Sequence, residues 1–212
     1  MTFTPIKTPL VAKKLFPNYV WDISTTEKVI YLTFDDGPTP EITNWTLSVL
    51  KEYNAKATFF SIGKNIKNHP DIFQNILNDG HAIGNHTQNH IKGWKNSAKA
   101  YLKNTIEAQE VIDSQKISTN LFRPPYGQIT PKQGKKLIEL GYKIVMWDVL
   151  SFDWDKDITQ EACYNNVISK AKNGSIIVFH DSVKASKNMQ YALPKVLKYF
   201  SEEGYRFKSL EF

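Results

Sequence analysis

The sequence is poor in cysteine and has no long apolar run. Its single cysteine, Cys163, excludes a framework of internal disulfides, and the helical pattern around it indicates a buried thiol. No stretch approaches the roughly 18 consecutive apolar residues of a membrane-spanning helix. Residues 1–21 lack the apolar block, ending in small residues, that marks a signal peptide. We therefore expect a cytoplasmic protein without a transmembrane segment.

The positive charge of the chain is spread along its length. The formal net charge is +6, but the lysines are scattered, which favours a solvated basic surface over a nucleic-acid groove. We expect no nucleic-acid partner. The segment PLVAKKLFPNYVW mixes apolar residues with two lysines, so peripheral association with a membrane stays open. We favour the alternative that this segment packs as an N-terminal arm.

The length and apolar content of the chain indicate its domain organisation. Its 212 residues, of which 41% are hydrophobic, suffice for one sizeable core and fall short of two. We therefore predict a monomer with one domain over residues 28–212, preceded by an N-terminal arm over residues 1–27.

Apolar runs alternate with helical patterns along this domain. Runs rich in β-branched and aromatic residues predict buried strands, and some helical segments have clear boundaries, such as Pro131 at a start and Gly141 at an end. This alternation indicates a mostly parallel sheet covered by helices, either open or closed into a barrel. The strands are expected at residues 29–34, 57–63, 143–150 and 175–180, and the helices near 40–53, 68–79, 97–115, 131–140, 159–172 and 189–202.

Polar residues gather where these strands end. Asp35 and Asp36 end the first run, in the stretch LTFDDGP, and His180 and Asp181 end the run SIIVF. The carboxyl ends of parallel strands carry the chemistry in such folds, so we expect these side chains to share one rim. Two adjacent carboxylates repel each other, and the pair therefore indicates a cation or a shared proton.

A second set of candidate ligands lies in GNHTQNH, where His86 and His90 are four residues apart. We expect this spacing to place both imidazoles on one side of a helical turn, where they can share a metal with one carboxylate. Alone, the pair would be more consistent with two surface histidines, but the aspartate pair favours the metal site. His69 and His81 have no such setting, and we interpret them as structural.

Five ordered motifs give the sequence a resemblance to a known family. TFDDGP, HTQNH, RPPYG, the DW of SFDW, and VFH look like the motifs of the polysaccharide deacetylases, also called NodB homology domains or the fourth family of carbohydrate esterases. The resemblance covers residues 28–210. It implies an α/β fold, a distorted (β/α) barrel with fewer than eight parallel strands, in which residues 28–212 form the catalytic domain.

The resemblance also implies a metal-dependent reaction. It makes Asp36, His86 and His90 the ligands of one divalent ion, most often Zn²⁺, with Co²⁺ or Ni²⁺ as alternatives. Asp35 then becomes the general base that accepts a proton from water. Arg123 of RPPYG is implied to hold Asp35 by a charge-assisted pair.

The remaining motifs imply the acid, the oxyanion donor and the pocket. His180 is the implied general acid, since an amide nitrogen must be protonated to leave, and Asp153 is its implied partner. The backbone N–H of Tyr126 is the implied oxyanion donor. Four residues are implied to contact the substrate: Pro124, Tyr126, Trp154 and Val178.

The fourth motif departs from the family pattern. Many members have an aspartate three residues before the aspartate of DW, whereas this chain has Leu150 there and Asp148 two residues earlier. The sequence leaves open whether Asp148 substitutes for it.

The substrate implied by the resemblance is an acetylated glycan. We expect removal of N-acetyl groups from N-acetylglucosamine-containing glycans of the chitooligosaccharide or peptidoglycan type, with release of acetate. Three alternatives remain: an O-acetyl esterase acting on xylan, a deformylase or deacetylase of a lipid-linked amino sugar, and a catalytically silent glycan-binding protein.

Overall fold

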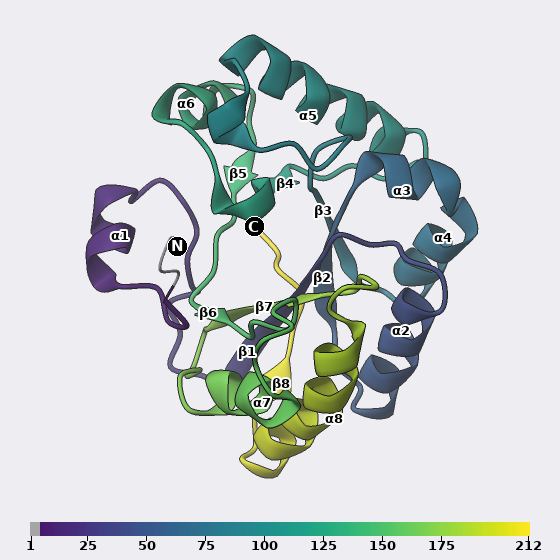
Figure 1. The fold of residues 1–212 in the computed structure, drawn as a ribbon, viewed down its shortest axis with the longest axis vertical. Coiled ribbons are helices and arrows are strands. Elements are labelled where there is room, and N and C mark those ends of the chain that lie inside the picture. Colours follow the sequence, from purple (N-terminus) through teal and green to yellow (C-terminus); the bar gives the residue numbers. More distant parts are fainter. Residues whose placement is uncertain (1–4) are drawn as a thin grey trace.

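Seven parallel strands follow one another around a curled, open barrel, and a short eighth strand pairs with the start of β1 (Figure 1). The computed structural model describes residues 5–212, and the strand order is β5-β4-β3-β2-β1-β7-β6. The expected α/β barrel with fewer than eight parallel strands is confirmed. The strands are β1 (Val29–Asp35), β2 (Ala57–Ser61), β3 (Ala82–Asn85), β4 (Leu121–Phe122), β5 (Lys143–Ile144), β6 (Val149–Leu150), β7 (Ile176–His180) and β8 (Arg206–Phe207).

Helices connect the strands and cover the outside of the barrel (Figure 1). Thr130 forms a capping box with Gln133 at the start of α6, a local arrangement that satisfies the first free N–H groups of a helix. The helix expected near 68–79 is found as α4 (Pro70–Asn78). A short helix before it, α3 (Gly63–Asn68), was not expected; it ends because His69, which precedes Pro70, leaves helical geometry. Within residues 5–212, no helix is both long and apolar enough to cross a bilayer. The helices are α1 (Leu10–Leu15), α2 (Ile42–Glu52), α3 (Gly63–Asn68), α4 (Pro70–Asn78), α5 (Ala98–Asp113), α6 (Pro131–Glu139), α7 (Gln160–Ile168) and α8 (Ser186–Glu202), with 3₁₀ turns η1 (Gly93–Lys95) and η2 (Pro125–Gly127).

The central strands are buried and fix the register of the barrel. Phe34 of β1 stacks on Phe59 of β2 and on Phe179 of β7, with ring centroids 5.0 and 6.1 Å apart. Strands buried on both faces are typical of parallel sheets. In this register Asp35 lies opposite His180 across the β1–β7 pair, so the packing of the core brings two of the predicted site residues to the same rim.

The prediction of a single strand over residues 143–150 is wrong. This run forms two short strands, β5 and β6, which lie at opposite edges of the sheet. The residues between them cross the gap in the barrel, and their carbonyl groups at Val145 and Met146 accept hydrogen bonds from the Arg123 side chain. The apolar run 143–150 therefore does not continue as one strand, because the buried Arg123 side chain binds the backbone carbonyl groups of Val145 and Met146.

The N-terminal segment lies across the same gap. Its backbone makes isolated bridges between Lys7 and Val149, between Val20 and Val145, and between Asp22 and Ser175. The arm expected at residues 1–27 thus contacts both edges of the sheet over its described part.

Gly174, which precedes the bridge between Asp22 and Ser175, lies against the N-terminal arm. Gly174 has φ of +77°, and a Cβ there would lie 1.8 Å from the Ile23 carbonyl oxygen. Gly174→Ala should therefore lower the free energy of unfolding by the left-handed strain of about 1 kcal/mol plus roughly 2 kcal/mol for overpacking. Gly141 is the matched control, because its φ is +89° but nothing lies within 4 Å of an added Cβ. Urea unfolding of both variants measures the difference, and equal losses would contradict the close approach of the arm.

Candidate active site

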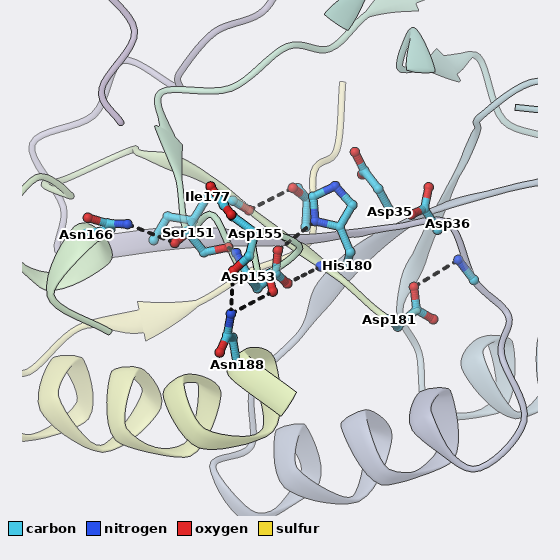
Figure 2. Close-up of polar contacts among 12 residues, drawn as sticks. Asp35, Asp36, Ser151, Asp153, Asp155, Asn166, Ile177, His180, Asp181 and Asn188 are labelled. Atoms are coloured by element: carbon cyan, nitrogen blue, oxygen red, sulfur yellow. Dashed lines mark hydrogen bonds and ion pairs between the residues drawn. The ribbon is translucent and has the colours of Figure 1, made fainter. Parts of the chain in front are cut away.

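The carboxyl ends of β1, β3, β6 and β7 and the loop after β4 surround one cavity of about 480 Å³. Figure 2 shows several of the carboxylates and His180 converging on this rim. Every predicted site residue lines the cavity except Arg123 and Asp153, which are fully buried beside it. The other lining residues were not predicted from the sequence: Gly127, Gln128, Trp147, Leu150, Ser182 and Lys184.

Asp35 is held by a buried arginine on one side of the cavity. Arg123 Nη1 donates to Asp35 Oδ1 and to Thr33 Oγ1, each at 2.7 Å. The rest of the guanidinium donates to the carbonyl groups of Val145 and Met146. Burial lowers the pKa of Arg123 and the charge of Asp35 opposes that change. The pair fixes the direction of the carboxylate, as predicted from RPPYG.

His180 is held by a second aspartate across the cavity (Figure 2). Its Nδ1 lies 2.8 Å from Asp153 Oδ1, and its backbone N–H donates to Asp153 Oδ2 at 2.7 Å. Burial works to lower the pKa of His180, but the charge and hydrogen bond of Asp153, together with the charges of Asp36 and Asp35, outweigh it and raise the pKa to about 9. The imidazole can therefore be protonated at neutral pH, which a general acid requires.

The loop that carries Asp153 is fastened by residues that the sequence analysis missed. The Asn188 amide, from α8, donates to the carbonyl groups of Asp153 and Asp155 at 3.1 and 3.0 Å. Asn166 of α7 donates to the Ser151 carbonyl at 3.1 Å. An asparagine inside each of two helical patterns is the sequence signal for this role.

Asp36, His86 and His90 form a cluster whose ligand atoms lie within 4.8 Å of one another. His86 Nδ1 lies 2.8 Å from the Arg123 carbonyl oxygen, so this nitrogen carries the proton and Nε2 keeps its lone pair toward Asp36. Burial lowers the pKa of His86 to about 4, and the ring is neutral at pH 7. Backbone hydrogen bonds to the second imidazole nitrogen are typical of metal-binding histidines.

The environment of Asp36 also fits a bound cation. Burial works to raise the pKa of Asp36, but the imidazoles of His90, His180 and His86 outweigh it and hold the pKa well below its usual range. Its Oδ1 is buried without a hydrogen-bond partner among residues 5–212, although His90 Nε2 lies 3.1 Å away. An ionised, unpartnered carboxylate oxygen facing two imidazole nitrogens suits a divalent metal of intermediate hardness.

The expectation that His86 and His90 lie on a helical turn is wrong. They lie in the loop after β3, and both Thr87 and His90 have positive φ, at +65° and +53°. Asp36, at +83°, has the same unusual backbone. Such conformations are costly and cluster at functional sites, so the two rings meet through a fixed irregular loop.

A buried carboxyl group supports the turn after Asp36. Asp181 accepts hydrogen bonds from the Gly37 N–H at 3.0 Å and from the Thr43 hydroxyl at 2.6 Å. Burial raises the pKa of Asp181 to about 8. A Cβ on Gly37 would lie 1.9 Å from this carboxyl group, which explains the glycine in TFDDGP.

Tyr126 lies at the mouth of the cavity with φ of +59°. Its ring is 4.6 Å from the His90 ring, and its N–H has no hydrogen-bond partner among residues 5–212. A free, fixed N–H in the residue that packs on His90 is available for an oxyanion.

Asp148 does not substitute for the aspartate absent at position 150. Its carboxylate is fully buried and bonds to Lys7, Lys13 and Ser175, whereas Leu150 lines the cavity. The fourth motif therefore contributes an apolar wall at this point.

Comparison with known proteins places the chain among glycan deacetylases. The family model described as "Polysaccharide deacetylase" matches residues 22–145. A peptidoglycan-N-acetylglucosamine deacetylase of Bacillus cereus is 35% identical over 206 residues, which cover 93% of this chain and 94% of that protein. A chitooligosaccharide deacetylase of Azorhizobium caulinodans is 34% identical over 161 residues, covering 75% of this chain and 76% of that protein.

Solved structures agree with this placement. The crystal structure of the Bc1960 peptidoglycan N-acetylglucosamine deacetylase superposes with a TM-score of 0.88 at 33% identity, covering 96% of this chain and 95% of that one. The peptidoglycan deacetylase PdaC of Bacillus subtilis gives a TM-score of 0.79 at 32% identity, covering 89% and 90%.

The Asp36, His86 and His90 cluster predicts metal binding. The purified protein should hold about one divalent ion per chain, and a His86→Ala, His90→Ala double variant should lose it on dialysis because two of three ligands are gone. His69→Ala, which removes an imidazole outside the cluster, is the control. Elemental analysis measures the metal content, and equal retention by the double variant and the control would show that the site is misassigned.

Proposed function

The chain belongs to the polysaccharide deacetylase family, and we propose that it removes N-acetyl groups from N-acetylglucosamine-containing glycans of the peptidoglycan or chitooligosaccharide type, with release of acetate. One observation carries the proposal. A carboxylate held by Arg123 and an imidazole held by Asp153 both line a single cavity that also contains the Asp36, His86 and His90 cluster. The named relatives support the glycan class.

The cluster is suited to Zn²⁺, with Co²⁺ or Ni²⁺ as alternatives, because two imidazoles and one carboxylate match these ions. When bound, such an ion supplies Lewis-acid activation of the acetyl carbonyl and of the attacking water. The neutral His86 ring and the ionised Asp36 are in the protonation states that ligands need.

Asp35 is the general base of the proposal. Arg123 binds its Oδ1, so the other carboxylate oxygen is available to take a proton from water in the cavity. The Tyr126 N–H then stabilises the negative charge that develops on the acetyl oxygen, because it is held in place before the reaction. Trp154 and Val178 line the cavity beside His180 and contribute its apolar wall.

His180 is the general acid. An amide nitrogen is too poor a leaving group to depart as an anion, so it must take a proton as the tetrahedral intermediate collapses. Asp153 favours the protonated form of His180 and binds the ring through Nδ1. The other ring nitrogen, Nε2, is then the one that donates the proton. An O-acetyl esterase would depend less on this proton, which makes His180 the residue that separates the two substrate classes.

Asp35→Asn tests the base. The variant should retain its metal but lose turnover by roughly a hundredfold or more, since an amide cannot accept the proton. Asp71→Asn, at an exposed position of α4, controls for the loss of one negative charge. Acetate release and metal content are measured together. Full turnover by a fully metallated Asp35→Asn variant would remove the base assignment.

His180→Ala tests the acid. The variant should lose most N-deacetylation of an acetylated chitooligosaccharide while an activated aryl acetate is still hydrolysed, because a phenolate leaves without protonation. In the wild type, activity on the amide should fall as pH rises through the His180 pKa of about 9, where the imidazolium proton is lost. The measurement is kcat/KM against pH for both substrates. Equal losses on amide and ester, with unchanged metal content, would leave His180 with a structural role.

A further inference from the structure

The segment between β5 and β6 supplies part of the cavity wall without the support of a sheet on both sides. It leaves one edge of the barrel at Ile144 and reaches the other at Val149. Trp147 and Leu150 from this region line the cavity. Leu150 lies in β6, which pairs with β7 on one side only, and Trp147 follows the two carbonyl groups that Arg123 binds. The positions of both residues therefore also depend on what else contacts this region.

The N-terminal arm holds the backbone of this segment. The Met146 N–H donates to the Val20 carbonyl at 2.7 Å, and the Leu150 N–H donates to the Ile6 carbonyl at 2.8 Å. Thr8 donates its N–H to the Asp148 carbonyl at 2.9 Å and its hydroxyl to the Trp147 carbonyl at 2.7 Å. The arm thus contacts the segment on both sides of Trp147.

Two lysines of the arm fasten it through one buried carboxylate. Lys7 Nζ donates to Asp148 Oδ2 at 2.9 Å, and Lys13 Nζ donates to Asp148 Oδ1 at 2.6 Å. Asp148 itself is fully buried and also accepts from Ser175. A buried carboxylate that loses its cations is strongly unfavourable, so these contacts define where the arm lies.

Apolar packing of α1 contributes little to this attachment. The helix has no buried residue, and Leu10 and Leu15 are 73% and 69% exposed. The ion pairs of Lys7 and Lys13 with Asp148 and the backbone hydrogen bonds therefore attach this part of the arm to the segment.

Trp147 of the crossing segment packs against Gly127, in the opposite wall of the cavity. A Cβ on Gly127 would lie 2.6 Å from Cη2 of the Trp147 ring, so the indole is fitted directly against the loop that carries Tyr126. A displacement of the crossing segment would move the ring and change the width of the cavity.

We propose that residues 6–22 are a positioning element of the substrate pocket, in which Lys7, Thr8 and Lys13 hold Trp147 and Leu150 in place to receive the glycan. The inference rests on the proposed deacetylase function for the identity of the ligand. It assigns to Lys7 and Lys13 a role in substrate binding and none in the chemical step.

A Lys7→Met, Lys13→Met double variant tests this role, because methionine keeps much of the apolar stem and removes the cation. The KM for an acetylated chitooligosaccharide should rise roughly tenfold, as expected for a displaced pocket wall. The kcat should change less than about twofold, since uniform binding alone is lost. Hydrolysis of a small aryl acetate, which makes fewer contacts with the cavity wall than an oligomer does, should be affected less. Lys14→Ala is the matched control, because Lys14 is exposed and adjacent to Lys13.

Binding of the same oligomer, measured by calorimetry in the Asp35→Asn background, separates this inference from the proposed function. If the wild type releases no acetate, the deacetylase proposal fails, while the Kd comparison still tests the arm. An oligomer KM and Kd equal to those of the Lys14→Ala control would overturn the positioning role. So would equal losses of kcat on both substrates, which indicate a general structural effect. If the double variant does not fold, Thr8→Ala and Lys13→Met are compared singly by the same measurements, with Lys13→Arg as the rescue variant.

Discussion

The buried ion pair between Arg123 and Asp35 is the interaction on which the rest of the site depends. A fully buried guanidinium is unfavourable unless every side of it is satisfied. Here strand β1 supplies Asp35 and Thr33, and the crossing segment supplies two carbonyl groups. The ring of Phe60 lies 4.1 Å from the remaining face. Satisfying one cation therefore fixes the direction of the Asp35 carboxylate and, together with the arm, the path of the segment that closes the cavity.

The four aspartates of the rim differ because their partners differ. Asp35 faces an arginine, Asp36 faces imidazoles, and Asp153 is paired with His180. Asp181 has only a hydroxyl and an N–H as partners, and burial raises its pKa to about 8. Four identical side chains thus occupy distinct geometries within one small region, and the environment shifts the pKa of Asp36 and that of Asp181 in opposite directions.

The sequence predicts the parts of this protein that depend on local patterns. The strands Val29–Asp35 and Ile176–His180 are visible in the sequence as apolar runs. Asp35 and His180 stand at the ends of these runs, so the sequence also predicts that they lie at the same rim. The sequence does not predict the division of the run 143–150, because the reason lies with Arg123, about twenty residues earlier in the chain. It also cannot assign Asn188, whose partners become visible only when α8 is packed against the loop of Asp153.

The arm has a consequence for the order in which the chain folds. Ile6 bonds to Leu150, and Asp22 bridges to Ser175, so the arm cannot make these contacts until residues well over a hundred positions later in the chain are in place. Contacts of such large sequence separation form late, since closing the intervening loop costs entropy that no local contact offsets. The barrel must therefore assemble with an open seam, and the seam closes when the arm packs onto it.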